Sequence, residues 1–295
     1  MPIHSFLNYL ALEKKYSKHT TTAYLNDLNA FQTFCNKEYD NQCVVEVNYA
    51  QIRNWIVSLV EAGISNRSIN RKVSSLKSFY KFLQKTKEIE SNPLNKHKVL
   101  KVAKQVQLPF SEKEIINALN LLDEEVNFES IRNKLIVELL YSTGMRRSEL
   151  INIKIIDLDF ANEIVKVLGK RNKERYIPLL KSVQKTLLNY IEFRNEISTN
   201  LSYLFITKKG KIMYDTLVYR VINIYFSKVS TKVKKSPHII RHSFATHLLN
   251  EGADLNSVKE LLGHSSLAST QIYTHSSLGK LKEVYNQAHP RSQKN

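Results

Sequence analysis

The sequence predicts a mainly α-helical protein with a small β-sheet, in which an all-helical N-terminal region is followed by an α+β C-terminal region. Three observations support this fold class. Residues 1–100 carry apolar side chains at helical spacing, residues 91–109 break that pattern with two prolines and four lysines, and residues 162–179 contain two short strand-like segments around a basic turn. A chain of 295 residues also has room for roughly two domains.

Three helices are expected in the N-terminal region. The first begins near Thr20, whose hydroxyl suits an N-cap, and the second covers YAQIRNWIVSLVEAG and closes at Gly63. The third begins at about Ser68, in SINRKVSSLKSFYKFLQK, and has an apolar stripe along one face. Trp55 and the tyrosines of this region fit a packed core better than a platform for stacking bases. We therefore expect a helical domain over residues 1–90.

Residues 91–108 are expected to form a basic linker, because this segment is rich in lysine and has no acidic residue. The C-terminal domain then covers residues 109–295. Its predicted elements are helices in SEKEIINALNLL and SIRNKLIVELLYSTG, strands at 162–168 and 175–179, a further strand and turn in LSYLFITKKGKIM, and helices from Tyr214 onward.

The chain is strongly basic. It has 44 Lys and Arg residues against 27 Asp and Glu residues, which is a formal net charge of +17. Both regions contribute, with 14 basic and 8 acidic residues in 1–100 and 30 basic and 19 acidic residues in 101–295. Two positive lobes suit a clamp around double-stranded DNA, where displaced counterions supply affinity that does not depend on base sequence. A solubilising surface, or a surface for acidic lipid, would carry the same charge.

The sequence lacks the usual signatures of several classes of protein. The two cysteines, Cys35 and Cys43, form neither a disulfide framework nor a CxxC pair, which fits a reducing cytosol. No apolar run approaches the roughly 18 residues of a membrane span, and the N-terminus does not resemble a signal peptide. The glycine motif of dinucleotide-binding proteins and the P-loop are both absent. We therefore expect a cytoplasmic protein with no membrane contact and no nucleotide cofactor.

Four segments of the C-terminal region concentrate cationic and proton-transferring side chains. They are STGMRRSEL with Arg146, GKRNKER with Lys170, SPHIIRHSFATHLL with His238 and Arg241, and ELLGHSSLASTQIYTH with His264 and Tyr273. His238 and Arg241 are three residues apart, so they share one face of a helix. Guanidinium groups suit binding of a phosphate, and a histidine near a tyrosine suits proton transfer.

Each of these residues also has a plain structural explanation. Arg146 fits a surface salt bridge with Glu149, and His242 and His247 fit packed helices. His238 and His242 have the spacing of a metal-binding pair, but the glutamate of an HExxH motif is absent and no cysteine lies nearby, so no metal site is expected. Spacing by itself does not decide between these alternatives.

Taken together, the four segments and the tail LKEVYNQAHPR resemble the tyrosine recombinases, specifically the Xer-type site-specific recombinases. The segments TTTAYLNDLNAFQTF and NRSINRKVSSLKSFYKFL are similar to the helical, SAM-like core-binding domain of that family. The likeness therefore spans nearly the full chain. It implies an N-terminal core-binding domain and a C-terminal catalytic domain that close around DNA as a clamp.

The resemblance implies six catalytic residues. Arg146 matches the first catalytic arginine, Lys170 the lysine of the β-hairpin, His238 and Arg241 the His-x-x-Arg pair, His264 the second histidine, and Tyr273 the nucleophile. Two positions depart from the family pattern. Arg147 stands where an apolar residue is common, and Arg171 stands in place of a frequent turn glycine.

The implied reaction is transesterification at a DNA phosphodiester without a metal, ATP or any other cofactor. Tyr273 would form a 3′-phosphotyrosyl intermediate, with His238 as its base and Lys170 as the acid that protonates the leaving 5′-oxygen. Arg146, Arg241 and His264 would stabilise the charge that develops on the phosphate oxygens. Further contacts with DNA are expected from basic residues that otherwise belong to a solvated surface, namely Arg71, Lys72, Lys77, Arg171 and Lys173.

The resemblance also implies partners. They are a double-stranded recombination site, a homo- or hetero-tetramer that can include a paralogous recombinase, and a septal DNA translocase. A C-terminal exchange helix at about 276–289 would dock on a neighbouring protomer. The implied role is resolution of chromosome dimers at a dif-like site, in the nucleoid. Alternatives are a mobile-element integrase, a type IB topoisomerase-like enzyme, or an architectural DNA-binding protein with an inactive site.

Overall fold

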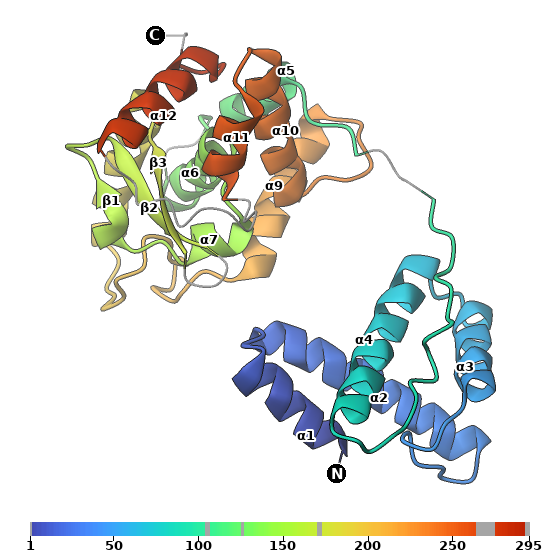
Figure 1. Ribbon diagram of the computed structural model, residues 1–295. Coiled ribbons are helices and arrows are strands. Elements are labelled where there is room, and N and C mark those ends of the chain that lie inside the picture. Colours follow the sequence, from blue (N-terminus) through green and yellow to red (C-terminus); the bar gives the residue numbers. More distant parts are fainter. Residues whose placement is uncertain (1, 104–106, 125–126, 170–172, 264–274, 293–295) are drawn as a thin grey trace. The chain divides into compact units, whose positions relative to one another are not determined.

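The computed structural model describes residues 2–103, 107–124, 127–169, 173–263 and 275–292, and in the last of these segments it describes side chains for Gly279 and from Lys282 onward (Figure 1). The chain divides into two compact units, Met1–Gln105 and Val106–Asn295. The first unit is helical throughout, and the second combines helices with one small sheet, which confirms the predicted fold class.

The first unit contains four α-helices within its described residues. They are α1 (Pro2–Asn8), which runs on into a π-helical stretch (Tyr9–Glu13), α2 (Lys18–Glu38), α3 (Tyr49–Glu61) and α4 (Asn66–Lys85). The helix starts differ from the expected ones. The Ser17 hydroxyl accepts the backbone N–H of Thr20 at 3.3 Å, so Ser17 is the N-cap of α2, and Ser65 caps α4 in the same way. Both expected helix starts lie about one turn too late, because Thr20 lies inside α2 and Ser68 inside α4.

Aromatic side chains fill the core of the first unit. Trp55 of α3 is 2% exposed, and its ring centroid lies 4.9 Å from that of Phe31 in α2. The buried hydroxyl of Tyr80 donates to the carbonyl oxygen of Val44 at 2.7 Å. A fully buried aromatic side chain of this kind stabilises the fold by roughly 1.5–3 kcal/mol. Trp55 is therefore a core residue, as expected.

The segment expected to be a basic linker contacts the helices of the first unit as far as Lys101. Leu94 is fully buried in the core of that unit. Further along, the Asn70 side-chain amide donates to the carbonyl oxygen of Leu100 at 2.8 Å and accepts the N–H of Leu100 at 2.9 Å. Asn66 donates to the carbonyl oxygen of Lys101 at 2.9 Å. The first unit thus extends past residue 90, because two asparagines of α4 bond to the backbone that follows it.

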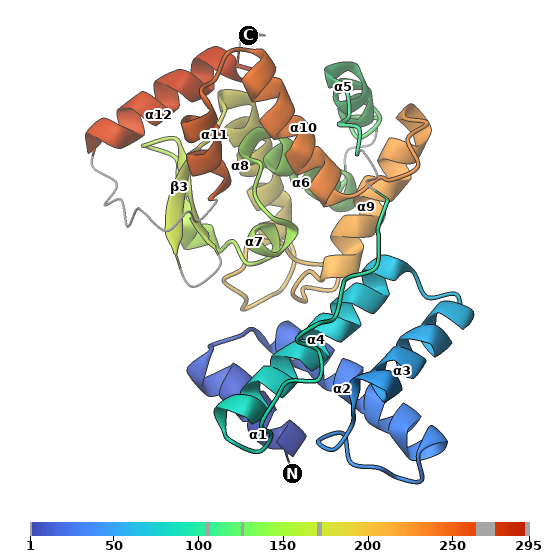
Figure 2. The same ribbon diagram turned by 45° about the vertical axis from the view of Figure 1, so that its right-hand side comes forward.

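The second unit has eight α-helices within its described residues. They are α5 (Glu112–Asn120), α6 (Phe128–Thr143), α7 (Arg147–Ile151), α8 (Lys181–Asn195), α9 (Asp215–Val229), α10 (Pro237–Asn250), α11 (Leu255–Leu262) and α12 (His275–Ala288), with a 3-10 turn at Ile155–Asp157. In both views α6 lies in the middle of the unit, with the sheet to one side and α9 to the other (Figures 1 and 2). A helix surrounded in this way is buried on nearly every side, and most residues of α6 are buried.

The sheet of the second unit is antiparallel, in the order β1 (Leu158–Asp159), β2 (Ile164–Leu168) and β3 (Glu174–Pro178). In the register, Val165 pairs with Ile177 and Val167 with Arg175. These strands agree with the two predicted strands to within two residues. The expected strand in residues 201–213 does not form, since that segment makes only isolated bridges, at Tyr203 and between Ile206 and Ile212.

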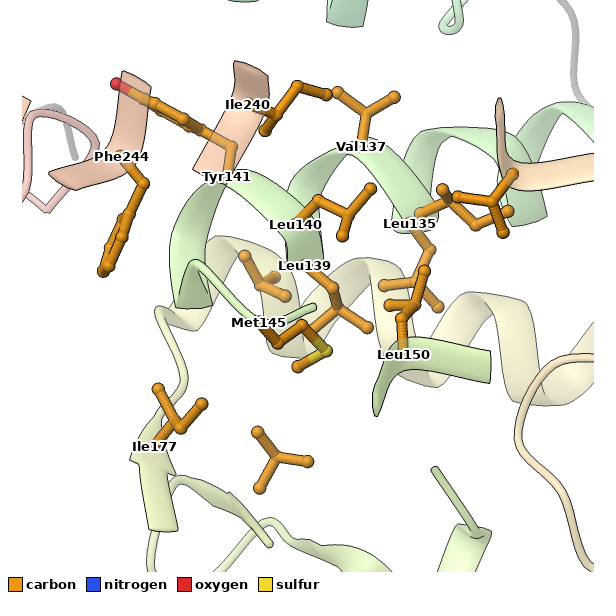
Figure 3. Packing of buried hydrophobic residues seen from close by; sticks show 14 of the residues in the cluster. Leu135, Val137, Leu139, Leu140, Tyr141, Met145, Leu150, Ile177, Ile240 and Phe244 are labelled. Carbon is orange, nitrogen blue, oxygen red and sulfur yellow. The ribbon is translucent and has the colours of Figure 1, made fainter. Parts of the chain in front are cut away.

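Buried side chains around α6 form the main core of the second unit, as Figure 3 shows for Leu139, Leu140 and Met145. The C-terminal part of α12 belongs to the same core. Tyr285 is fully buried and donates to the carbonyl oxygen of Ser142 at 2.8 Å, and the Arg291 guanidinium pairs with the buried Glu138 carboxylate at 2.9 Å. In this structure α12 thus packs on its own chain. Over the described residues, no helix is long and apolar enough to cross a membrane.

Candidate active site

Gly144 creates the turn that presents Arg146. It ends α6 in the left-handed conformation, with φ of +59°. A Cβ atom at this position would lie 2.6 Å from Cε1 of Phe244 and 2.9 Å from Cδ2 of Leu262, so only glycine fits. Two residues later Arg146 occupies the N-cap position of α7 in an extended conformation. The close packing of the turn therefore determines where the first arginine lies.

Glu149 holds Arg146 at that position. One oxygen of its carboxylate, Oε1, accepts Nη1 of Arg146 at 2.8 Å, and the other, Oε2, accepts the backbone N–H of Arg146 at 2.7 Å. Glu149 is 5% exposed, so this pair is not the surface salt bridge considered from the sequence. Burial alone would raise the pKa of Glu149, but hydrogen bonds from Arg175 and Arg146 outweigh it, and the pKa lies below its usual range.

Arg175 completes this ion cluster from β3. Its Nη1 and Nη2 atoms donate to the two oxygens of Glu149 at 3.1 and 2.7 Å, and its Nε donates to the carbonyl oxygen of Leu261 at 2.9 Å. The sequence reasoning did not single out Arg175. A signal was present, because Arg175 alternates with Ile177 on the inward face of β3, where a charged residue needs a partner.

Arg241 of α10 reaches the same place from the other side. Its Nη1 donates to the carbonyl oxygen of Gly144 at 2.6 Å, and its Nη2 donates to that of Leu262 at 2.7 Å. Burial first, and then the nearby charges of Arg146 and Arg175, lower the pKa of Arg241 to about 10. The guanidinium still carries its charge at neutral pH. Arg146 and Arg175 add positive charge beside it, and this concentration of cations favours a bound anion.

The three guanidinium groups meet at the C-terminal end of α11. They contact the carbonyl oxygens of Leu261, Leu262 and Gly263, and the last of these contacts, from Nη2 of Arg146, is 3.5 Å long. The last carbonyl groups of a helix have no partner inside it and carry partial negative charge, so cations are stabilised there. Arg146 keeps 33% of its side chain exposed. An anion from solvent can therefore reach it.

The other predicted catalytic residues divide into two groups. His238 is exposed on α10, one turn before Arg241, and shares its face. Lys170, His264 and Tyr273, with Arg171, lie outside the described residues. The residues that precede Lys170 and His264 lie beside the ion cluster. A Cβ on Gly169 would lie 3.4 Å from Nη1 of Arg175, and one on Gly263 would lie 3.1 Å from the same atom.

The remaining histidines of α10 do not form a site. His247 is 8% exposed, and its Nδ1 lies 2.8 Å from the hydroxyl of Tyr141, so it is a core residue, as expected. His242 is exposed. Within the described part of the chain, no three histidine, cysteine, aspartate or glutamate side chains are grouped so that they could hold a metal ion.

The basic residues expected to contact DNA lie at several places. Arg71 and Lys72 of α4 are bound to Asp27 of α2, which is 1% exposed. The Arg71 guanidinium donates to both carboxylate oxygens, at 2.5 and 2.8 Å, Lys72 to one of them at 3.3 Å, and the Ser75 hydroxyl to the other at 2.7 Å. Arg71 nevertheless keeps 53% of its side chain exposed. Lys77 and Lys173 are exposed as well.

A two-unit basic chain with two anchored guanidinium groups, one of them open to solvent, is equipped to bind and activate a phosphodiester. Comparisons with known proteins agree that the chain belongs with proteins that act on phosphodiesters. Residues 107–279 match the phage integrase family, and residues 3–87 match the phage integrase N-terminal SAM-like domain. The chain therefore belongs to the phage integrase family, and its activity is that of a tyrosine recombinase.

Individual relatives cover almost the whole chain. The tyrosine recombinase XerC of Pediococcus pentosaceus is 38% identical over 292 residues, which are 97% of each protein. Among solved structures, the XerH site-specific recombinase bound to a palindromic difH substrate has a TM-score of 0.70 at 21% identity, over 96% of this chain and 93% of that chain. The Tn1549 transposon integrase in complex with circular intermediate DNA has a TM-score of 0.70 at 21% identity, over 95% and 98%.

Proposed function

We propose that the protein is a site-specific recombinase that cuts and rejoins DNA through a covalent bond between Tyr273 and the 3′ phosphate. The observation that carries this proposal is the anchoring of Arg146 and Arg241 at one helix end, with the buried carboxylate of Glu149 beside them. Two fixed guanidinium groups can bind both non-bridging oxygens of a scissile phosphate, and their charge does not depend on pH in the neutral range.

In the proposed reaction, the Tyr273 hydroxyl oxygen attacks the phosphorus atom and the bond from phosphorus to the 5′ oxygen breaks. His238 takes the proton of the tyrosine, whose pKa of about 10 otherwise keeps it neutral. Lys170 gives a proton to the leaving 5′ oxygen, and His264 donates to the phosphate together with the arginines. The new ester keeps the energy of the broken one, so a 5′ hydroxyl of another strand can reseal it without ATP.

The biological role proposed is resolution of chromosome dimers at a dif-like site during segregation. Support comes from the likeness over almost the full length to a protein named tyrosine recombinase XerC, and from the likeness of the fold to a recombinase bound to a difH substrate. In this role the protein acts in the nucleoid as a tetramer, alone or with a paralogue, and in cooperation with a septal DNA translocase. Arg71, Lys72, Lys77, Arg171 and Lys173 are proposed as further DNA contacts.

Exchange of α12 between protomers would link the active sites of such a tetramer. The contacts with its own chain that Tyr285 of α12 and Arg291, just after α12, make are available in the same form on a second copy. Swapping an element between identical subunits costs little, because each contact is replaced by its equal. A chain that ends at residue 276 should fail to form the synaptic complex, whereas normal synapsis and recombination by that chain would contradict the exchange of α12.

A second candidate role is integration of a mobile element. The fold likeness to the Tn1549 transposon integrase favours it, and the chemistry would be the same. Covalent capture separates the two roles. Sheared DNA of the host is incubated with the protein in EDTA without ATP, adducts that survive denaturation are isolated, and the attached DNA is sequenced. Capture of one fixed chromosomal site supports dimer resolution, whereas capture of element ends supports integration.

The same covalent-capture experiment tests whether the protein cleaves DNA through Tyr273. Tyr273→Phe should give no adduct while it binds the recovered site with unchanged affinity. An adduct that persists in this variant would disprove the role of Tyr273. Tight binding without an adduct by the unmodified protein, with and without a paralogue, would favour an architectural role. Relaxation of supercoiled plasmids that lack the site would instead indicate a topoisomerase.

A further inference from the structure

We propose that Arg175 is a positioning residue for the reaction, which sets the place of the Arg146 guanidinium through the carboxylate of Glu149 and the end of α11. The inference rests on the proposed function, since it concerns how Arg146 meets the scissile phosphate. Arg175 is 4% exposed, so it has no direct access to DNA. Any effect on the reaction must pass through the groups that it contacts.

Those contacts involve three separate elements. Arg175 lies on β3, Glu149 on α7, and Leu261 in the last turn of α11. The planar guanidinium spans them all, with two parallel bonds to the carboxylate and one from Nε to the carbonyl oxygen. This arrangement fixes both the position and the plane of the carboxylate, which a single bond would leave free to rotate.

The plane of that carboxylate decides where Arg146 lies. Oε1 of Glu149 accepts from both Arg146 and Arg175, at 2.8 and 3.1 Å, and Oε2 accepts from Arg175 and from the Arg146 backbone, both at 2.7 Å. Each oxygen is thus shared between the two arginines. A rotation of the carboxylate would move the Arg146 side chain relative to its own backbone and to the phosphate.

Two glycines show how closely the backbone packs on Arg175. A Cβ on Gly263 would lie 3.1–3.2 Å from three atoms of the Arg175 side chain, and a Cβ on Gly169 would lie 3.4 Å from its Nη1. Gly169 directly precedes Lys170 in the sequence, and Gly263 directly precedes His264. Arg175 therefore lies beside the residues that precede two further members of the proposed site, besides holding Glu149.

Lysine cannot do the work of Arg175. It keeps the positive charge but has one nitrogen, which cannot bond to both carboxylate oxygens and to a carbonyl on a third element at once. Arg175→Lys should therefore loosen Arg146 without leaving Glu149 unneutralised. A displacement of about 1 Å in a positioned group can lower a rate by up to about 100-fold. We expect Arg175→Lys to slow release of the 5′-hydroxyl strand by about 10- to 100-fold.

A substrate with a neutral phosphate shows whether Arg175 positions Arg146 or only stabilises the fold. In a methylphosphonate at the scissile position, a methyl group replaces one non-bridging oxygen and removes the negative charge, so little is left for Arg146 to stabilise. Strand release is measured in single turnover on the captured site with either phosphate. The loss caused by Arg175→Lys should shrink to within about threefold on the methylphosphonate, because it arises from the charge of Arg146.

The matched control is Arg194→Lys. Arg194 is also a buried arginine of the second unit, and it donates to the carbonyl oxygens of Leu201, Tyr203 and Leu204. This variant should lose stability but should slow both substrates by the same factor. If Arg175→Lys does not fold, Arg175→Gln replaces it, because a neutral amide leaves no unpaired cation, and the same dependence on substrate is expected.

Two results would overturn the inference: an equal loss on both substrates, or cleavage of the ordinary phosphate at the unmodified rate. A double variant gives a second test, since Arg146→Lys with Arg175→Lys should be no slower than Arg146→Lys alone if Arg175 acts through Arg146. Failure of the proposed function is recognised separately, because the unmodified protein would then form no adduct at Tyr273.

Discussion

Arg241 of α10 donates a 2.6 Å hydrogen bond to the carbonyl oxygen of Gly144, the residue at which α6 ends. One proposed catalytic cation thus holds the turn that positions the other, because Arg146 follows Gly144 by two residues. The second bond of Arg241, to Leu262, connects this turn to the end of α11. A change in any one of these three segments is therefore expected to affect both arginines.

Gly144→Ala tests how tightly this turn is packed. Alanine would be strained at a φ of +59°, and its Cβ would collide with Phe244 and Leu262. We expect a loss of about 2–4 kcal/mol in the free energy of unfolding of the second unit, measured in urea. Gly252→Ala is the control, because Gly252 has a φ of +88° with no atom within 4 Å of a Cβ, and it should cost about 1 kcal/mol. Equal losses would show that the collision is relieved easily.

Arg241→Lys tests the electrostatic role of the second arginine. A lysine at this position keeps one charge but cannot bond to Gly144, Leu262 and a phosphate together. Cleavage of the captured site should fall by about 10²- to 10³-fold, while the dissociation constant for DNA should change by no more than about threefold, because binding rests on many contacts. A parallel loss of binding and cleavage would argue that Arg241 acts mainly in affinity.

Asp27→Asn tests the buried ion cluster of the first unit. The change removes the negative charge on which Arg71 and Lys72 converge, and it leaves one acceptor oxygen for four donor contacts. Arg71 is half exposed, so its guanidinium can turn towards water. We therefore expect a loss of about 2–3 kcal/mol in the free energy of unfolding of the first unit. Fluorescence of Trp55, the single tryptophan, reports this unit in urea. Asp40→Asn, at an exposed position, should change stability by less than about 0.5 kcal/mol.

His289 should make the second unit sensitive to acid. Burial lowers the pKa of His289 from 6.5 to about 3. The hydrogen bond to the Tyr141 carbonyl opposes this shift in part, and the charges of Arg291 and His247 add smaller decreases. Between these values the unfolded chain binds a proton that the folded chain does not, so stability is complete above about pH 6.5 and falls as the pH drops towards 3.

Titration of His289 should make the free energy of unfolding change by about 1.4 kcal/mol per pH unit in the middle of that range, because about one proton is bound on unfolding. This slope is measured from unfolding in urea followed by circular dichroism. Trp55 lies in the first unit, so the transition of the second unit is the one that its fluorescence does not report. His289→Gln should flatten the dependence, whereas the exposed His19→Gln should leave it unchanged. An unchanged slope in His289→Gln would assign the acid sensitivity to other groups.

Patterns of short range predict the elements well. Apolar spacing identifies α3 and α4, and the alternating segments identify β2 and β3, since each depends on neighbours a few residues away. The helix starts are less certain in such a reading, because Thr20 and Ser17, or Ser68 and Ser65, are chemically alike. Only the bond that is actually made, from the Thr20 or Ser68 N–H to the earlier serine, decides which one is the cap.

Contacts of long range are what the sequence does not reveal. Residues 91–101 look like a free basic tether, yet Leu94 and Leu100 are held by the helical core and by Asn70, 30 residues before Leu100. Residues 201–213 have the composition of a strand but find only isolated partners. The stabilisation that such contacts give depends on which surface a distant part of the chain offers, and no local sequence pattern carries that information.

The sequence by itself determined the class of the fold and the basic character of both units, and its resemblance to the tyrosine recombinases supplied the residues proposed for catalysis. Only the tertiary structure decided that Glu149 is buried rather than a surface partner, and that Arg175 joins Arg146 to the end of α11. Glu149 and Arg175 are 26 residues apart, and Arg175 and Leu261 are 86 apart. The physical reason is that a buried charge is stable only beside its partner, and that partner is supplied by the folding of distant strands and helices around it.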